Sequence, residues 1–397
     1  MTSKPVEHSS RSHALLSASG ASRWLNCTPS ARLEESYGEK KSSVYAAEGT
    51  LAHELAELYI RIDTLMDISQ GEYSERLCKI MSDELYSDEM QDALPMYTQY
   101  CHEQFMEALI FDENARIEIE QQLDLTKYVP ESFGTADCVI IGNGRMEVID
   151  LKYGKGVRVQ AEWNKQLMLY ALGALAKYNT YDITEVKVTI VQPRLDSISS
   201  WVVSKKDLVE WAETELKPKA KMAFTGEGEL SSGEWCKFCA VRNRCRRLYE
   251  DQIKIARYEF KAPNLLTDEE VAYVVMCLPD LIEWASGITS YATETAVNSG
   301  KHWPGLKLVE GVSRRKWTDE DTAGDIIKQR LPELSDEDLY TSKLNSITAI
   351  EKTVGKKRFT SLLSDLIIKP QGKPVLVKED DKRPALGLEQ ARQDFKD

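Results

Sequence analysis

Two carboxylates and a lysine near the middle of the chain are the residues best suited to chemistry. The run MEVIDLK carries Asp150 and Lys152, and GTAD, upstream of it, carries Asp137. Alternate side chains of a strand share a face, so Asp150 and Lys152 should project together while Leu151 points into the core. A carboxylate can hold a hard divalent cation, and the lysine can stabilise charge on a phosphate or position an attacking water. The tripeptide alone is weak evidence, because D-x-K is also common on solvated strands.

Three other polar residues have positions from which they could join this group. His53 lies near the first turn of a helix predicted over residues 46–66, four residues after Gly49, which would allow a close approach of the chain. Gln166 and Tyr170 are four residues apart on a helix predicted after the strands, so they share one face. Each of them alone is typical of a surface or packing position. If they converge on the strand carboxylates, the resulting group is unusual without a metal.

The spacing of the cysteines indicates a second metal site. Cys236, Cys239 and Cys245 follow the pattern C-x2-C-x5-C, which suits ligation better than packing. Three ligands leave a closed site one short, and Cys27, near a helix end, is the candidate fourth ligand. Zinc and an iron-sulfur cluster both fit this spacing. The other cysteines are interpreted as small core residues: Cys78, Cys101, Cys138 and Cys277.

Length and charge limit the classes of protein to which the chain can belong. Its 397 residues allow two or three domains, and a hydrophobic content of 42% allows a sizeable core. The net charge of -13 argues against a protein coated in nucleic acid, since nonspecific phosphate binding needs a basic surface. A local basic groove is still compatible with this charge. Its candidate residues are Lys155, Arg158, Lys165, Arg194, Lys237, Arg242, Arg244, Arg246 and Arg247.

The hydrophobic pattern predicts helices, then neighbouring strands, a helix and a further strand. RIEIEQQLDL, GTADCVII and MEVIDLKY are the first strands, the last two joined by a tight turn at GNG. A helix over NKQLMLYALGALAKY and a strand over EVKVTIVQPRL follow, and a linker or helical region leads to the cysteines. From about residue 262 the chain is expected to form a separate, mostly helical unit.

We expect a cytoplasmic protein, because neither a membrane span nor a secretory signal is recognised in the sequence. No apolar run approaches the roughly 18 residues of a membrane span. The polar start MTSKPVEHSSRSH lacks the apolar core of a secretory signal. In that compartment the eight cysteines are expected to be reduced, and so available for metal rather than joined in disulfides.

Taken together, the motifs resemble a known nuclease pattern. The order GTLAH, GTAD, VIDLK and QLMLY resembles the signatures G-x-x-x-H, G-x-x-D, D-x-K and Q-x-x-x-Y of RecB-type nucleases in the PD-(D/E)XK superfamily. One cysteine before this core and three after it look like the iron-sulfur clasp of AddB-type and CRISPR-adaptation exonucleases. The aspartate before x-K departs from the glutamate of the wider superfamily, as it does in the RecB branch. The whole chain further resembles a phage and prophage family of largely uncharacterised proteins.

The resemblance implies a restriction-endonuclease-like α/β fold, in which helices flank a mixed sheet, with an added and mostly helical C-terminal region. The implied parts are a disordered N-terminus (1–15), a RecB-like nuclease domain closed by the cysteine cluster (16–250), a mostly helical domain (251–369) and an extended or disordered tail (370–397).

The resemblance also implies a role for each residue of the site. Lys152 would orient or activate the attacking water, with Gln166 and Tyr170 holding it and the DNA backbone in register. The ligands of Mg²⁺ or Mn²⁺ would be His53, Asp137, Asp150 and the backbone carbonyl of Leu151. The ligands of a 4Fe-4S cluster, with zinc as the alternative, would be Cys27, Cys236, Cys239 and Cys245.

We therefore expect a metal-dependent DNA exonuclease that serves phage DNA recombination, repair or replication. Its partners would be DNA and, in a phage, a single-strand-binding or annealing protein, with self-association as a further option and no membrane. Two alternatives come from other classes: a non-catalytic DNA-binding or scaffold subunit of a nuclease complex, and a zinc-stabilised helical adaptor. The intact set of His53, Asp137, Asp150 and Lys152 argues against a non-catalytic subunit, since a degenerate site would be expected to lose at least one member.

Overall fold

The computed structural model describes residues 14–37, 44–258, 266–311, 316–339, 344–368, 374–378 and 384–385. Contacts between residues divide the chain into two compact units, Met1–Arg257 and Tyr258–Asp397. Most of the expected disordered N-terminus and most of the expected tail lie outside the described residues.

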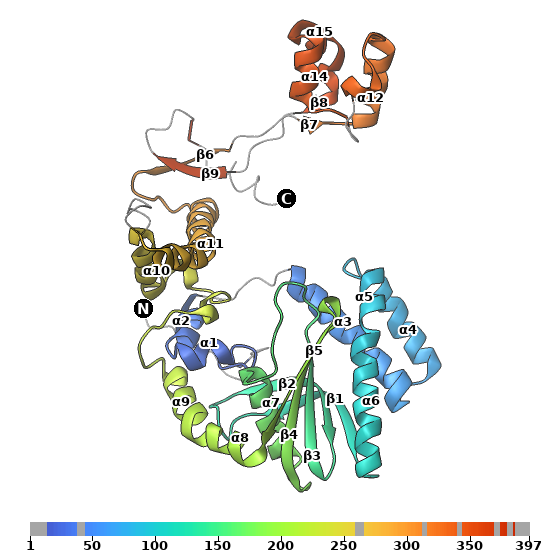
Figure 1. Ribbon diagram of the computed structural model, residues 1–397, viewed down its shortest axis with the longest axis vertical. Helices are drawn as coiled ribbons and strands as arrows, with labels where there is room; N and C mark the ends of the chain where they lie inside the picture. The colour runs from blue at the N-terminus through green and yellow to red at the C-terminus, as the bar shows by residue number, and fades with distance from the viewer. Residues whose placement is uncertain are drawn as a thin grey trace. The chain divides into compact units, whose positions relative to one another are not determined.

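A five-stranded mixed sheet forms the centre of the described part of the first unit (Figure 1). β3 and β4 are parallel, and the other neighbouring strands are antiparallel. Helices flank this sheet, so the expected mixed α/β architecture is confirmed. The strands, in spatial and in chain order, are β1 (Arg116–Asp124), β2 (Phe133–Ile141), β3 (Gly144–Leu151), β4 (Ile183–Gln192) and β5 (Ser197–Ser204).

Alternation along β3 separates two hydrophobic cores, one on each face of the sheet. Met146 and Val148 face the first core, and Ile149 and Leu151 face the second. The first core is covered by α1 (Ala21–Asn26), α2 (Ser30–Tyr37), α7 (Lys165–Lys177), α8 (Lys205–Trp211), η4 (Ala212–Leu216) and α9 (Lys217–Thr225). The second is covered by α3 (Val44–Ile60), η2 (Arg61–Leu65), α4 (Gln70–Met81), α5 (Asp88–Ala93) and α6 (Pro95–Phe111).

The two strands that carry the predicted acidic residues separate where those residues lie. The pairing of β2 with β3 ends at Cys138 and Ile149, so Asp137 and Asp150 come just beyond the last backbone pair. β3 continues beside β4 through Leu151. The resulting opening lets side chains from the two strands face each other.

A continuous run of tight turns precedes the last helix of the first unit. The backbone N–H of Cys239 donates to the carbonyl of Cys236 at 3.1 Å, and that of Arg242 donates to Cys239 at 3.2 Å. The N–H of Cys245 then donates to Arg242 at 3.3 Å. The short helices of this region are η5 (Glu234–Cys236) and η6 (Arg242–Arg244), and α10 (Arg246–Tyr258) follows them. A further short helix, η3 (Pro193–Leu195), lies between β4 and β5.

The second unit combines helices with two short strand pairs. β6 (Leu306–Glu310) pairs with β9 (Pro374–Lys378), and β7 (Lys316–Trp317) pairs with β8 (Ile367–Ile368). β9 lies within the segment expected to be extended or disordered, and it is a paired strand there. The helices are α11 (Asp268–Ser299), α12 (Glu320–Arg330), α13 (Asp336–Leu339), α14 (Ile347–Val354), α15 (Lys356–Leu363) and η8 (Ser364–Leu366).

α11 is long, apolar and largely uncovered. Among the described residues, it is the single helix whose length and composition would allow it to cross a membrane. A stretch of 18 residues within it has a mean hydropathy of 1.4, and 11% of that stretch is buried. The expectation that no run approaches a membrane span is therefore wrong on length and composition. The helix also carries Pro279, Asp280 and Glu283 near its middle, and charges at that depth are costly in a bilayer.

Candidate functional site

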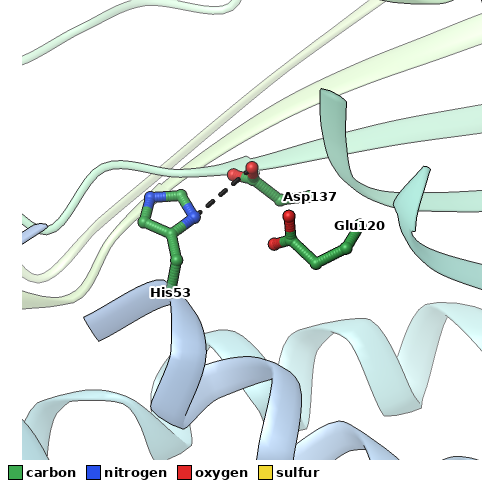
Figure 2. Close-up of side chains that lie close together, drawn as sticks. All are labelled: His53, Glu120 and Asp137. Carbon is green, nitrogen blue, oxygen red and sulfur yellow. Dashed lines mark ion pairs between the residues drawn. The ribbon is translucent and has the colours of Figure 1, made fainter. Parts of the chain in front are cut away.

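His53, Glu120 and Asp137 converge at the opening between β2 and β3 (Figure 2). One ligand-type atom from each lies within 4.8 Å of the other two. His53 Nδ1 forms an ion pair with Asp137 Oδ1 at 3.3 Å. The imidazole comes from α3 and the two carboxylates come from neighbouring strands. Carboxylate oxygens with one imidazole nitrogen suit Mn²⁺ and Mg²⁺, so this group could hold one divalent cation.

The ionisation of these three groups is interdependent. Burial lowers the pKa of His53, but the adjacent Asp137 carboxylate outweighs it and raises that pKa to about 9. Burial acts to raise the pKa of Asp137, yet His53, Lys152 and the N–H of Leu151 hold it below its ordinary value. Reduced hydration and the Asp137 charge raise the pKa of Glu120 to about 7. Without a cation, a protonated imidazole therefore neutralises the Asp137 carboxylate near neutral pH.

A second set of polar side chains surrounds Asp150. This carboxylate is buried, with 2% of the residue exposed, and its Oδ2 forms an ion pair with Lys152 Nζ at 2.8 Å. Gln166 Nε2 donates to Asp150 Oδ1 at 3.1 Å, and Lys152 Nζ donates to Gln166 Oε1 at 3.1 Å. Gln166 Nε2 also donates to Tyr170 Oη at 3.2 Å. A single amide group therefore orients both the carboxylate and the ammonium.

Asp137 connects the two sets. Its Oδ2 accepts a hydrogen bond from the backbone N–H of Leu151 at 2.7 Å, while its Oδ1 faces His53. Within the described part of the chain, the cluster of ligand atoms around His53 does not include Asp150, which stays with Lys152. Of the expected metal ligands, the structure thus brings His53 and Asp137 together, places Asp150 beside the lysine, and joins Leu151 to the site through its N–H.

The environment of Lys152 fixes its charge. Burial lowers its pKa, but Asp150 and Asp137 outweigh that effect and keep the pKa above its ordinary value. Burial raises the pKa of Asp150, against the Lys152 charge, which lowers it. Burial also raises the pKa of Tyr170, so its hydroxyl is neutral. At neutral pH Lys152 can therefore donate hydrogen bonds and stabilise negative charge, and it has no lone pair with which to accept a proton.

Local sequence explains how two helices present their polar residues. On α3 the buried side chains of Leu55 and Leu58 pack in the second core, and His53, which is half-buried, lies at the edge of that face. α7 begins after Asn164, whose side chain accepts a hydrogen bond from the N–H of Leu167 at 3.2 Å. Packing therefore holds α3 near His53, and the N-cap holds the start of α7 near Gln166.

Gly134 and Gly49 differ in how closely other side chains approach them. A Cβ on Gly134 would lie 2.7 Å from Tyr170 Cε1, so the glycine of GTAD lets the tyrosine ring pack on the strand. A Cβ on Gly49 would meet no heavy atom within 4 Å among the described residues. The close approach expected at Gly49 is therefore wrong. The close approach found at Gly134 was not predicted, and it results from the packing of Tyr170.

The structure brings Cys27 to the segment that carries the other three predicted cysteine ligands. Its thiol interacts electrostatically with those of Cys236 and Cys245. Burial raises the pKa of Cys27 and of Cys236, and it raises that of Cys239 to about 11. Among the described residues, no three of these sulfur atoms all lie within 4.8 Å of one another. The thiols are thus grouped, but more widely than the roughly 3.8 Å between sulfurs on one tetrahedral zinc ion.

Polar contacts hold the two cysteine-bearing segments together. Thr28 Oγ1 donates to the carbonyl of Glu227 at 2.5 Å, and the N–H of Ala240 donates to Glu34 Oε1 at 2.6 Å. Each bond joins the chain near α1 and α2 to the turns that follow α9. These two hydrogen bonds therefore also keep Cys27 near the later cysteines.

Several basic residues predicted to line a groove are already paired. Lys155 lies 2.6 Å from a carboxylate oxygen of Glu89. Arg194, which is nearly buried, forms ion pairs with Glu48 at 3.0 Å and Glu89 at 2.9 Å. These contacts join the loop after β3 and the turn after β4 to α3 and α5. Lys155 and Arg194 are therefore ion-paired and are not free charges.

Glu120 is the member of the cluster that sequence reasoning misses. Its backbone has a φ of 48°, which is rare for a glutamate and interrupts the regular alternation of β1. The antiparallel register places it opposite Asp137, between the pairs Ile119–Cys138 and Gln121–Ala136. Aligning RIEIEQQ antiparallel to GTADC was the signal that could have identified it.

Comparison with known proteins gives a family but no activity. The family model described as "Protein of unknown function (DUF2800)" matches residues 13–384. A solved structure described as "Crystal structure of SSO0001" is similar at 16% sequence identity, covering 56% of this chain and 95% of that chain with a TM-score of 0.21.

Proposed function

We propose that this chain, which belongs to the DUF2800 family of proteins of unknown function, is a divalent-metal-dependent DNA exonuclease that hydrolyses phosphodiester bonds. The observation that carries the proposal is the joint geometry of the two sets. A potential cation cluster at His53, Glu120 and Asp137 lies one hydrogen bond away from the ordered Asp150, Lys152 and Gln166 group. With a cation bound, such a combination would bring a metal, a charge-stabilising ammonium and an acceptor carboxylate to the same opening of the sheet.

The residues present fit a hard divalent cation. Asp137 and Glu120 offer oxygen ligands and His53 offers a nitrogen, which together are acceptable to Mn²⁺ and Mg²⁺. Asp150 would join them when cation charge competes with Lys152 for its oxygens. When bound, such a cation lowers the pKa of a coordinated water and offsets negative charge on the phosphate.

The chain's own side chains then divide the remaining tasks. Lys152 donates hydrogen bonds to the attacking water or to a phosphate oxygen, because its pKa keeps it protonated. Gln166 holds the Lys152 ammonium by its carbonyl oxygen and Asp150 by its amide N–H, so it positions both side chains before substrate binds. Tyr170, which is buried, accepts a hydrogen bond from the same amide and so helps to hold Gln166 in place.

We further propose that the first unit is a PD-(D/E)XK domain of the RecB type, acting in the cytoplasm on phage or prophage DNA. The order of the site residues along helix, strand, strand and helix supports this assignment, as does the position of Asp150 and Lys152 at the end of β3 next to the parallel strand β4. A DNA end is the substrate that the resemblance implies, and a single-strand-binding or annealing protein is the implied partner.

The proposal includes a 4Fe-4S cluster held by the four grouped cysteines. The thiol chemistry fits, since four cysteines from two segments approach one another. No three of the sulfurs all lie within 4.8 Å of one another, which is wider than one zinc ion requires and favours the cluster in this proposal. The cluster would fasten the start of the domain to its end and leave the hydrolytic chemistry to the sheet.

A nuclease assay on end-labelled DNA tests the activity. Single- and double-stranded substrates are incubated with wild-type protein and Mg²⁺ or Mn²⁺, and Asp150→Ala is the matched variant. We expect metal-dependent release of label by the wild type and none by Asp150→Ala at equal folding, judged by thermal melting. Equal degradation by both proteins would reject the proposed site, whereas DNA binding without degradation by either would favour a non-catalytic subunit.

Metal content tests the cluster separately. Protein purified without oxygen should be brown, absorb near about 400 nm and contain iron and sulfide. A colourless protein with one zinc per chain would assign the cysteines to zinc.

A further inference from the structure

An exposed tryptophan stands directly before the helix that carries Gln166. The indole of Trp163 is 52% exposed, and the residue has a φ of 53°. A bulky side chain in that left-handed region is a genuine outlier. Such strain persists where the surroundings hold it in place, and it tends to gather at binding sites. Trp163 is therefore a residue whose exposure and backbone both need an explanation.

The surroundings of Trp163 form a small aromatic and basic platform. Its ring packs against Trp201 on β5, with ring centroids 5.0 Å apart and planes tilted by 40°. Lys165 Nζ lies 5.3 Å from the centre of the Trp163 ring and 4.8 Å from that of Trp211. Trp201 therefore packs against the indole, Lys165 Nζ lies over its ring, and about half of Trp163 is still open to solvent.

The platform is tied to the row of the sheet that holds Asp150. Asp150 pairs with Ile190 on β4, and Ile190 pairs with Ser199 on β5. Ser199 Oγ accepts a hydrogen bond from the N–H of Ala161 at 3.0 Å and donates to Gln160 Oε1 at 2.9 Å. Since neighbouring strands are about 4.8 Å apart, the backbone of Ser199 is about 10 Å from that of Asp150. The loop that presents Trp163 is thus anchored within reach of one or two nucleotides from the site.

The far end of the same loop is fixed as well. The buried Gln192, at the end of β4, accepts a hydrogen bond from the N–H of Val159 at 2.7 Å and donates to the carbonyl of Val157 at 2.9 Å. Bonds from β4 and β5 therefore hold the loop between β3 and α7. The platform is preformed, which lowers the entropic cost of binding a flexible ligand.

We infer that Trp163, supported by Trp201 and Lys165, stacks against an unpaired nucleobase and directs a single-stranded DNA end to the site at Asp150. This inference rests on the proposed nuclease function and names its substrate class. An open indole stacks on any base, because every base has a π-face, and the ammonium of Lys165 attracts the adjacent phosphate. A paired base in the middle of a duplex has both faces covered by its neighbours, so the platform discriminates against intact duplex.

Binding without cleavage gives the first test. Fluorescence anisotropy of a labelled oligothymidine and of a labelled blunt duplex is measured in chelator, where no hydrolysis occurs. We expect Trp163→Ala to raise the Kd for oligothymidine by roughly 5- to 100-fold and to change duplex binding little. Phe111→Ala, which removes an aromatic ring that is 81% exposed at the end of α6, should leave both Kd values unchanged.

Two further variants keep the test decisive if the alanine variant folds poorly. Trp163→Phe retains an aromatic face and should keep most of the affinity for oligothymidine. Trp163→Leu retains bulk without that face and should lose it. Equal affinities of the phenylalanine and leucine variants, or an equal loss on single strand and duplex, would overturn the inference.

The outcome for the inference is separable from that for the proposed function. If wild-type protein binds oligothymidine through Trp163 but degrades no DNA with Mg²⁺ or Mn²⁺, the nuclease proposal fails and the platform stands. If wild-type protein degrades DNA and Trp163→Ala binds and degrades single strands as well as the wild type does, the platform fails and the nuclease proposal stands.

Discussion

Lys152 Nζ lies 2.8 Å from Asp150 Oδ2, and one glutamine amide contacts both side chains, with Lys152 following directly after the end of β3. This pair is buried at its acidic end and half-exposed at its basic end. The ammonium is therefore held by the protein on one side and turned toward the opening on the other.

Replacing Lys152 tests whether its charge acts in the reaction. Lys152→Met keeps the length of the side chain and removes the ammonium, so we expect metal-dependent DNA hydrolysis to fall by at least about 100-fold. The pKa of Asp150 should rise further, since the Lys152 charge now lowers it. Lys177→Met, on an exposed turn of α7, is the matched control and should retain its activity. An unchanged initial rate in Lys152→Met would exclude the assigned role.

Replacing Glu120 tests the cluster that the fold creates. We expect Glu120→Gln to weaken Mn²⁺ binding by at least about tenfold in calorimetry, because one carboxylate ligand is lost. Glu118→Gln changes a glutamate two residues earlier on β1 and outside the cluster, and it should bind Mn²⁺ as the wild type does. Equal affinities of the two variants would place the cation elsewhere.

The ion pair of His53 with Asp137 should make the stability of metal-free protein depend on pH. The folded pKa of about 9 lies above the ordinary value of 6.5, so the stabilisation is complete below 6.5 and is lost as pH rises through about 9. With 32% of the imidazole side chain exposed, solvent screening reduces the effect to on the order of 1 kcal/mol. Urea unfolding in chelator across this pH range should show the loss in wild-type protein and not in His53→Gln. Parallel pH profiles of the two proteins would contradict the assignment.

Gly134→Ala should disturb the site through packing alone. The added Cβ would lie 2.7 Å from Tyr170 Cε1, so the ring must move and the free energy of unfolding should fall by about 1–3 kcal/mol. We expect reduced nuclease activity as well, because Tyr170 shares its hydrogen bond with Gln166. Gly154→Ala is the control, since its Cβ would meet no heavy atom within 4 Å among the described residues. Similar melting temperatures for both variants would show that the ring has room to adapt.

Cys27→Ser should lower the iron content of protein purified without oxygen and should loosen the attachment of α1 and α2. The cause is the loss of a ligand that is distant in sequence from the other three. Cys78→Ser changes an exposed cysteine outside the group and should keep the iron content of the wild type. Full iron content in Cys27→Ser would remove Cys27 from the ligand set.

Sequence patterns predicted the parts of the site that depend on regular structure. The alternation of MEVIDLK gives Asp150 and Lys152 a common side, and the four-residue spacing of Gln166 and Tyr170 gives them one helix face; both geometries are periodic. Glu120 depends instead on one irregular φ angle, which no periodic pattern encodes.

β5, the last strand of the sheet, was equally hard to predict. β5 lies in SISSWVVS, where serines occupy half of the positions and weaken the apolar signal of a strand. Its pairing with β4, which is set by contacts across the sheet, determines the strand more than its own composition does.

The hydrogen bond from the N–H of Leu151 to Asp137 makes one amide proton a reporter of the whole centre. Its exchange with solvent deuterium depends on the Asp137 carboxylate remaining ionised and in place, since no backbone pair of β2 and β3 extends that far. Following this single proton by NMR would therefore show cation binding, protonation and loosening of the strands without any substrate being present.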